Sequence, residues 1–155
     1  MIKLLAAVLL TLSSGLAWAQ TCTVSSVHDG DSMRVLCPGQ KKTIPIRLDQ
    51  IDTPELNQAH GTRSRDYLQS ICPVGKPATI INHGLDQYKR TIGTVTCGGV
   101  NANAAMVKTG NAWVYDQYVR DRSLYQLQDV AKATRSGLWE NRNAMAPWEF
   151  RRANQ

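Results

Sequence analysis

A short apolar run that ends in an arginine and two carboxylates is the most constrained stretch of the chain. Apolar and polar side chains alternate over residues 43–48, which predicts a half-buried strand with Arg47 on its polar face. Pro54 disfavours helical geometry in the residue before it, so the chain leaves this strand as a turn. Such a turn can aim Asp52 and Glu55 at one point in space. The alternative is a solvated strand end followed by a charged turn.

The N-terminus has the pattern of an export signal. Lys3 precedes an apolar run over residues 4–12, and residues 17–19 have the small-x-small pattern of a signal-peptidase site. The run is too short to span a membrane. We therefore expect residues 1–19 to be a signal peptide. Residues 20–155 then form one soluble domain with one core, periplasmic or secreted, without membrane contact after cleavage.

Four cysteines suggest disulfides, which are the usual fate of cysteines in an exported chain. They are Cys22, Cys37, Cys72 and Cys97. The first two lie equidistant from a turn at Asp29-Gly30, and the last two from a turn near Gly84. In antiparallel hairpins such pairs would face each other across the strands, which predicts Cys22–Cys37 and Cys72–Cys97. Zinc is the alternative, but the chain lacks a Cys-x-x-Cys motif and its three histidines are scattered.

The order of short elements indicates a mainly β domain with some α-helix. We expect strands at residues 21–27, 33–36, 43–48, 78–82 and 91–97. Helices are expected at residues 61–71 and 102–109, and a third capped by Ser123, stopped at 136–137, with Leu124, Leu127 and Ala131 facing inward. Residues 83–86 should form a turn, and the polar tail from residue 140 should dock through Trp148 and Phe150. Five short strands in one small domain favour a Greek-key β-barrel.

Carboxylates occur at two turns that a small barrel would bring together. Asp31 follows the Asp29-Gly30 turn, although this turn sequence is common for backbone reasons alone. Asp31, Asp52 and a backbone carbonyl would supply hard oxygen ligands, which suit Ca²⁺ and do not suit zinc. Without a metal ion, clustered carboxylates would need neighbouring lysines or arginines to neutralise them.

Two arginines could bind the substrate of such a metal site. Arg47 and Arg90 each present a planar guanidinium that matches phosphate oxygens. Glu55 would then act on a water molecule as general base or hold it in position. Alternatively, Arg90 is an exposed charge at a strand end. The chain has 18 Lys and Arg against 12 Asp and Glu, a net charge of +6, which favours a polyanionic partner without establishing one.

Several ordered motifs resemble the staphylococcal (micrococcal) nuclease-like family over nearly the whole predicted domain. They are Asp29-Gly30-Asp31-Ser32, Arg47-Leu48-x-x-Ile51-Asp52-Thr53-Pro54-Glu55, Asp86-x-Tyr88-x-Arg90, Asn103-x-x-Met106-Val107-x-x-Gly110-x-Ala112 and Gly137-Leu138-Trp139. Residues 147–151, Pro-Trp-Glu-Phe-Arg, resemble a closing segment of many bacterial members. Three positions depart from the family: Ser32 replaces threonine, Lys89 stands where many members have glycine, and Gln50 stands where many have a small residue.

The resemblance implies an OB-fold, a five-stranded Greek-key β-barrel with three α-helices, and Ca²⁺-dependent hydrolysis of DNA and RNA that leaves 3′-phosphates. By motif position, Asp31 and Asp52 would bind Ca²⁺ by side chain and Thr53 by its carbonyl, and Arg47, Glu55 and Arg90 would be catalytic. Tyr88 and Tyr115 would border the nucleotide pocket, where an aromatic ring can stack on any base.

We expect a monomeric endonuclease. The alternative is a non-catalytic nucleic-acid-binding OB module, which would have no need to keep the acidic residues and arginines together. A disulfide-stabilised structural or protein-binding domain would leave that set unexplained.

Overall fold

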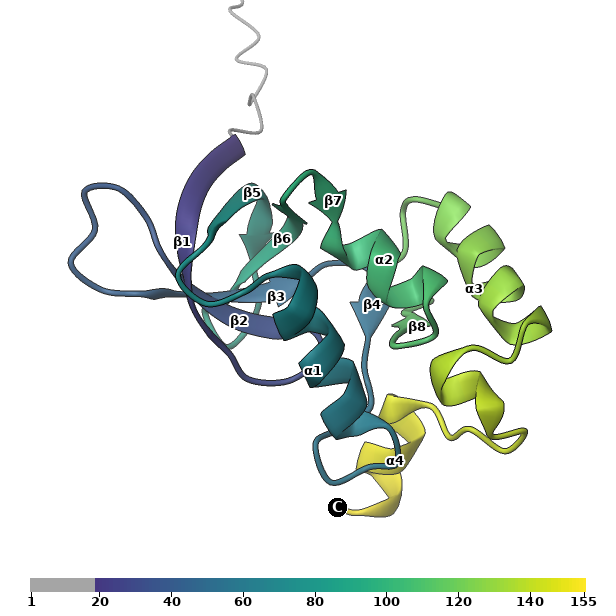
Figure 1. The fold of residues 1–155 in the computed structure, drawn as a ribbon. Coiled ribbons are helices and arrows are strands. Elements are labelled where there is room, and N and C mark those ends of the chain that lie inside the picture. The colour runs from purple at the N-terminus through teal and green to yellow at the C-terminus, as the bar shows by residue number, and fades with distance from the viewer. Residues whose placement is uncertain (1–18) are drawn as a thin grey trace, which may run out of the picture.

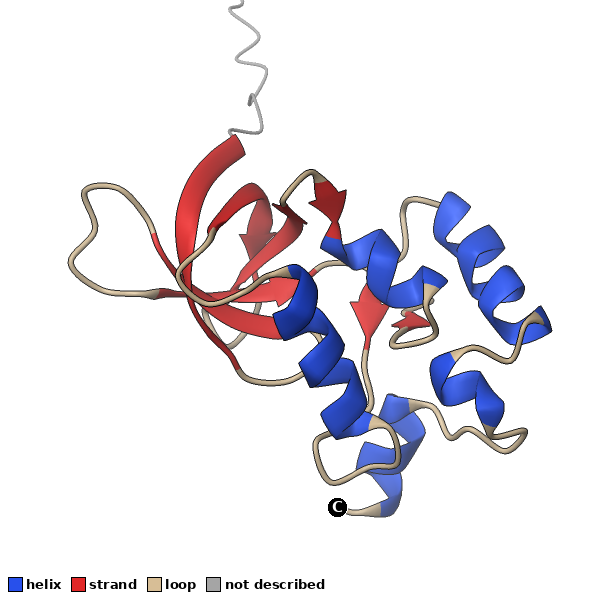
Figure 2. Cartoon of the chain, in the orientation of Figure 1, coloured by secondary structure: helices blue, strands red, loops and turns tan. Residues whose placement is uncertain are grey.

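The chain closes a five-stranded β-barrel, and most of its helices gather on one side of that barrel (Figures 1 and 2). The computed structural model describes residues 19–155. The strands in this range are β1 (Ala19–Val27), β2 (Ser32–Leu36), β3 (Ile44–Leu48), β4 (Ile51–Asp52), β5 (Pro77–Leu85), β6 (Thr91–Cys97), β7 (Val100–Asn101) and β8 (Trp113–Val114). The helices are α1 (Gly61–Ile71), α2 (Ala102–Lys108), α3 (Ser123–Ala133), the 3-10 turn η1 (Gly137–Glu140) and α4 (Pro147–Ala153).

The barrel is closed by pairing between its two end strands. The order is β3-β2-β1-β5-β6, and β6 returns to pair in parallel with β3. In this pairing Ile46 lies opposite Thr91 and Leu48 lies opposite Gly93. Closure gives each of the five barrel strands two neighbours, which is how small β-barrels avoid edge-to-edge association. The expected five-stranded OB-type barrel is therefore confirmed.

Alternate residues of the barrel strands point into one core, and the helices cover it. The strand residues of this core include Val24, Met33, Val35, Ile46, Leu48, Ile80 and Val95, and the helices add Leu68, Met106 and Val107. Each buried side chain of this size contributes about 1.5–3 kcal/mol relative to exposure. The alternating pattern of apolar residues thus fixes which face of each strand points away from the core, including the partly buried polar face of β3 that carries Arg47.

The turn between β1 and β2 packs closely on the rest of the fold because it contains a glycine. A Cβ atom on Gly30 would lie 2.8 Å from Ser64 Cβ and 2.9 Å from Thr53 Cβ, which is closer than side chains can approach. Asp29 accepts a hydrogen bond from the backbone N–H of Asp31, 3.0 Å away, and stabilises the turn. Asp31 is thereby brought against the segment that follows β4.

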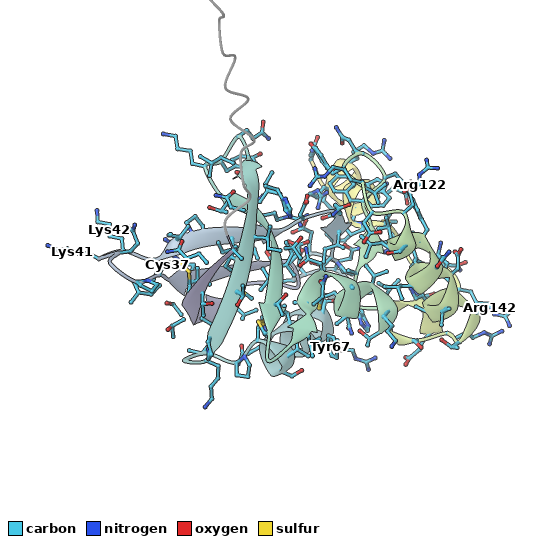
Figure 3. The ribbon with its side chains drawn as sticks, turned by 90° about the horizontal axis from the view of Figure 1, so that it is seen from above. Cys37, Lys41, Lys42, Tyr67, Arg122 and Arg142 are labelled. Carbon is cyan, nitrogen blue, oxygen red and sulfur yellow. A yellow bond between two sulfur atoms is a disulfide. The ribbon has the colours of Figure 1, made fainter. Side chains whose placement is uncertain are left out.

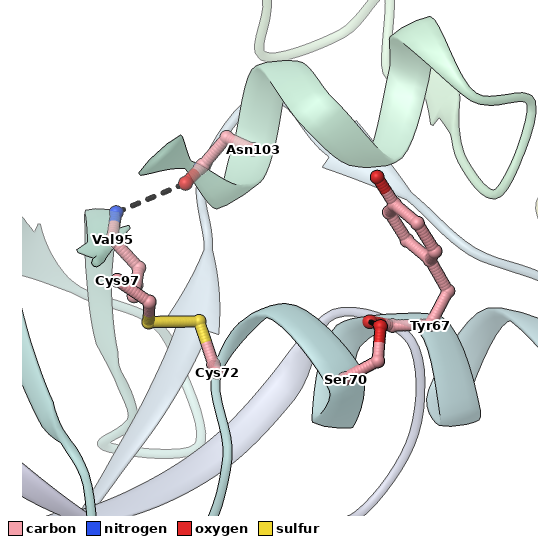
Figure 4. Close-up of a disulfide and its surroundings, with 6 residues drawn as sticks. All are labelled: Tyr67, Ser70, Cys72, Val95, Cys97 and Asn103. Atoms are coloured by element: carbon pink, nitrogen blue, oxygen red, sulfur yellow. Dashed lines mark hydrogen bonds between the residues drawn. A yellow bond between two sulfur atoms is a disulfide. The ribbon is translucent and has the colours of Figure 1, made fainter. Parts of the chain in front are cut away.

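Both predicted disulfides are present, but the reasoning behind one of them was wrong. Cys22–Cys37 joins the ends of the β1–β2 hairpin, as expected. Cys72 follows α1 rather than lying in a strand, and it bonds Cys97 at the end of β6, as Figure 4 shows. In the sheet, Cys97 lies opposite Ala78. The second disulfide therefore fastens a helix to the barrel instead of joining two strands of a hairpin.

Three other expectations are corrected. Strand β5 continues to Leu85 through a bulge near residue 83, so the turn to β6 lies at residues 86–90 and not at 83–86. The tail is not simply polar, because it forms η1 and α4, which raises the α-helix count in the described range from three to four. Ser123 is the first residue of α3 and not its cap; Arg122 holds the cap position, and the Asp121 carboxylate before it accepts bonds from the N–H and hydroxyl of Ser123. The inward face of α3 is as expected, since Leu124 and Ala131 are buried and Leu127 is partly buried against the core, and Gln128 is buried on it as well.

The proposed signal peptide, residues 1–19, lies outside the described residues except for Ala19. Within residues 19–155, no helix has the length and apolar character that crossing a bilayer requires.

The Cys72–Cys97 disulfide predicts a measurable contribution to stability. Replacing both cysteines by alanine should lower the free energy of unfolding by about 2–5 kcal/mol, because the cross-link restricts the unfolded chain. Urea denaturation of the double variant and the oxidised parent measures this difference, with Cys22–Cys37 intact in both. An unchanged denaturation midpoint would contradict the prediction.

Candidate active site

Arg47 brings two buried carboxylates together at the end of β3. Its Nε lies 3.2 Å from an oxygen of Asp31, and its Nη2 donates to Asp52 Oδ1 at 3.1 Å. Nη1 also donates to the carbonyl oxygens of Leu48 and Ile51. Asp31 and Asp52 are 6% and 2% exposed, so the arginine supplies the charge that a pair of buried carboxylates requires.

The sheet register explains why these residues meet. Strand β2 pairs with β3 so that Ser32 lies opposite Arg47, which places Asp31, one residue earlier, beside the guanidinium. Thr53 then fixes the orientation of the Asp31 carboxylate. Its backbone N–H and its hydroxyl both donate to Asp31 Oδ2, at 2.8 and 2.9 Å.

Asp31 is the most strongly perturbed acid of this group. The pKa of Asp31 is raised to about 7, first by burial and then by the negative charges of Asp29 and Asp52, while Arg47 and the Thr53 hydroxyl oppose the shift. The site therefore holds more negative charge than Arg47 alone compensates. A bound cation would relieve this excess.

Arg90 reaches the same cleft from the neighbouring strand. The parallel pairing of β3 with β6 sets Arg47 opposite Ile92, so Arg90 lies just before the paired segment. Its Nε donates to Asp86 Oδ2 at 2.7 Å. Burial raises the pKa of the Asp86 carboxyl, but the hydrogen bonds from the Arg90 backbone and guanidinium outweigh it and keep that pKa below its ordinary value. Among the described residues, the two terminal nitrogens of Arg90 have no hydrogen-bond partner.

Glu55 lies in the turn after β4, at the rim of the site. Its side chain is 38% exposed, and its Oε1 accepts a hydrogen bond of 2.8 Å from Arg151. Arg151 also donates to both carboxylate oxygens of Asp52, at 2.7 and 3.3 Å. Burial lowers the pKa of Arg151, but its hydrogen bonds to Asp52 and Glu55 outweigh this and raise the pKa above its ordinary range. Arg151 was not among the predicted site residues.

All eight predicted metal, catalytic and substrate-binding residues line one open cleft of about 620 Å³. They are Asp31, Arg47, Asp52, Thr53, Glu55, Tyr88, Arg90 and Tyr115. Tyr88 is 71% exposed at one side of the cleft. Tyr115 lines it as well, with one ring face stacked on Trp148 at 5.4 Å between centroids. Tyr118, half exposed, lies edge-on to Tyr115 and was not predicted.

Arg120 is another cleft residue that the sequence alone did not reveal. It forms an ion pair with the buried carboxylate of Asp49. Gln50 holds the same loop, because its side-chain oxygen accepts hydrogen bonds from the backbone N–H groups of Arg120 and Asp121, both at 2.6 Å. Gln50 has a positive φ of 67°, as a glycine would, and its side chain provides two contacts that a glycine lacks. Lys89 has φ 62°, and nothing in the structure explains its presence there.

The donor set fits a hard cation better than a transition metal. Within residues 19–155, no three side chains of His, Cys, Asp or Glu converge as a site built from side chains alone requires. Asp31 and Asp52 instead offer two carboxylates that Arg47 brings together, next to the backbone of Thr53. Calcium accepts such a mixture of carboxylate, carbonyl and water oxygens, whereas zinc favours nitrogen and sulfur.

Asp31 should make the stability of the metal-free protein depend on pH. Its pKa is about 7 in the folded chain against an ordinary value of 3.8, so the folded state binds this proton more tightly. The resulting stabilisation is complete below the unfolded pKa and is lost as pH rises through the folded pKa. Urea midpoints measured with a chelator should therefore fall between about pH 4 and pH 8. Asp31→Asn should flatten this fall, and an equally steep fall in the variant would assign the effect to another group.

Comparisons with known proteins agree with this arrangement. Residues 45–141 match the sequence model of a family described as "Staphylococcal nuclease homologue". The chain is 39% identical over 132 residues to an "Uncharacterized endonuclease" of Haemophilus influenzae, which covers 85% of this chain and 73% of the relative. It is 37% identical over 141 residues to an "Uncharacterized endonuclease" of Escherichia coli O157:H7, covering 87% and 90%. It is 35% identical over 166 residues to the "Micrococcal nuclease" of Shigella flexneri, covering 99% and 94%. With its barrel, its cleft and these matches, the chain belongs to the staphylococcal nuclease homologue family.

Proposed function

We propose that the protein is an exported, monomeric, Ca²⁺-dependent endonuclease that hydrolyses phosphodiester bonds of DNA and RNA and leaves 3′-phosphates. One observation carries the proposal. The buried pair Asp31 and Asp52 meets Arg47 in the same cleft as Glu55 and Arg90. Two buried carboxylates beside a phosphate-binding arginine repel a nucleic acid, which is itself an anion. A domain that only bound nucleic acid would therefore have no use for them.

The two arginines are placed to hold the scissile phosphate. Hydrogen bonds to Leu48, Ile51 and Asp52 occupy three of the five N–H donors of Arg47. A further donor on Nη2 is available to a phosphate oxygen. Arg90 offers its terminal nitrogens as a fork, since only its Nε is engaged among the described residues. Stabilising the charge that grows on the phosphate oxygens is the main catalytic task of such groups.

Asp31 and Asp52 would hold the Ca²⁺ ion by their carboxylates, with the Thr53 carbonyl and water completing the shell. The ion, when bound, supplies positive charge beside the scissile phosphate. Glu55, at the open rim of the same cleft, accepts the proton of the attacking water or orients that water toward phosphorus.

Charge and exposed aromatic rings support a nucleic-acid substrate, and the disulfides support a location outside the reducing cytosol. Basic side chains such as Lys41, Lys42, Arg122 and Arg142 project from opposite ends of the domain in Figure 3. Such charge attracts a polyanion, and binding should weaken as salt rises. Tyr88 and Tyr118 expose rings at the cleft that could stack on bases without sequence preference. Two disulfides suit the periplasm or the medium, to which the N-terminal pattern points.

Activity should depend on Ca²⁺ and on both arginines. With plasmid DNA and Ca²⁺ the parent should give degradation that a chelator abolishes. Arg47→Ala and Arg90→Ala should each lower kcat by about 10²–10³-fold, because each removes a donor that stabilises the transition state. Arg34→Ala is the matched control, since Arg34 bonds Thr43 on the strand beside the site. Equal rates for Arg90→Ala and Arg34→Ala would contradict the assigned role.

The product ends test the direction of cleavage. Short DNA and RNA oligonucleotides labelled at the 5′ end should give fragments whose new 3′ ends are phosphorylated. Treatment with a phosphatase specific for 3′-phosphates would then slow the fragments in a sequencing gel. Fragments that resist this treatment would show cleavage on the other side of the phosphorus.

A further inference from the structure

Glu55 sits on a turn that cannot hold its carboxylate in place by itself. Residues 53–60 separate β4 from α1 and contain no helix or strand. The backbone of this turn is short and close to α1, since a Cβ on Gly61 would lie 1.8 Å from the Glu55 carbonyl oxygen. Among the described residues, the only partner of the Glu55 carboxylate is Arg151.

A second contact joins the same turn to the chain just before α4. Gln58 accepts a hydrogen bond from the Glu55 backbone N–H at 3.1 Å and donates from its Nε2 to the Met145 carbonyl at 2.8 Å. Gln58 is only 9% exposed, so this bridge lies inside the fold. The side chain and the backbone of Glu55 are thus both held by the segment at residues 145–151. In Figure 1, α4 lies beside the loop that enters α1.

The segment that makes these contacts is itself fixed to the body of the domain. Ala146 and Pro147 are buried where α4 begins. Trp148 stacks on Tyr115 with an interplanar angle of 3°, and lies edge-on to Trp113 at 5.7 Å between centroids. Arg151 therefore extends from a helix anchored by an aromatic cluster, and not from a loose tail.

We propose that Arg151 is a positioning residue of the active site, which holds Glu55 in the geometry that the attacking water requires. The inference rests on the proposed function, and it gives a role to a residue that the closing segment at residues 147–151 contains but to which no motif assigned one. Arg151 does not contact the reacting atoms; it acts through the Glu55 carboxylate. The segment at residues 145–151 is in this view part of the catalytic apparatus.

Because Arg151 also contacts Asp52, the proposal predicts different effects of an Arg151 substitution on Ca²⁺ affinity and on kcat. Arg151 donates to both Asp52 oxygens, so its positive charge stands close to a carboxylate that would bind Ca²⁺. Removing that charge should leave Ca²⁺ affinity unchanged or strengthen it, by about fivefold for a pair screened as in bulk water and by more where burial weakens the screening. Loss of Glu55 positioning, in contrast, should lower kcat. A variant that merely damaged the fold would weaken both.

Arg151→Gln tests the proposal, with Arg152→Gln as the control that removes one exposed arginine from the same helix. At saturating Ca²⁺, we expect Arg151→Gln to lower kcat by about 10- to 100-fold, with KM for DNA within about threefold of the parent, because misplaced catalytic groups cost rate rather than binding. Arg151→Lys should recover part of the loss. Isothermal titration with Ca²⁺ alone should give an equal or lower Kd than the parent. Arg152→Gln should match the parent in every measurement.

Hydrogen exchange of the metal-free protein gives a readout that does not require activity. Amides of residues 55–61 should exchange faster in Arg151→Gln, and also in Gln58→Ala, which removes the second contact. If kcat and exchange in Arg151→Gln both stay within twofold of the parent, Arg151 does not position Glu55. If kcat falls while the Ca²⁺ Kd rises in proportion, Arg151 supports the metal site instead, and the proposal also fails.

Failure of the proposed function would look different. A parent protein that cleaves no nucleic acid with any divalent cation would refute the nuclease assignment, whereas the exchange comparison would still decide whether Arg151 holds the turn.

Discussion

The candidate site depends on the interaction of Arg47 with two carboxylates in a nearly dry environment. Asp31 comes from the turn after β1, Asp52 comes from β4, and the guanidinium lies against both. A buried charge is tolerated only when it is paired and hydrogen-bonded, and Arg47 is the one side chain that pairs with both carboxylates among the described residues. The arginine that would bind the substrate therefore also keeps the two carboxylates in place. Loss of Arg47 would leave Asp31 with the hydrogen bonds from Thr53 and Asp52 with Arg151, but without the charge that joins them.

Much of the fold was predictable because its signals are local. Alternation over residues 43–48 located β3 and the polar face that carries Arg47. The Asp-Gly turn located the first hairpin, and α1 was predicted with the bounds that the structure gives it. Asp31, Arg47, Asp52, Glu55 and Arg90 were found because each lies beside a strong turn or strand signal, and because their order resembles a known family.

The parts that were missed depend on contacts between distant segments. Arg151 and Glu55 are separated by 96 residues, and no periodicity connects a helix of seven residues with the turn after β4. The only sequence feature that pointed to this region was the closing segment at residues 147–151, which resembled that of family members but indicated no role for Arg151. The Cys72–Cys97 disulfide was predicted from the equal spacing of the two cysteines about a turn. That reasoning placed Cys72 in a strand, whereas Cys72 ends helix α1. Strand β5 extends beyond the expected turn because a bulge lets it follow β6 farther.

Closure of the barrel determines when, during folding, Arg47 and Arg90 come together. Arg47 belongs to β3 and Arg90 precedes β6, and these strands pair only when the two ends of the sheet meet. Contacts between segments so far apart in sequence form slowly, because the intervening chain must first be ordered. A newly made chain with an open sheet thus keeps Arg47 and Arg90 apart. The proposed site is therefore complete only after the last pair of strands has formed.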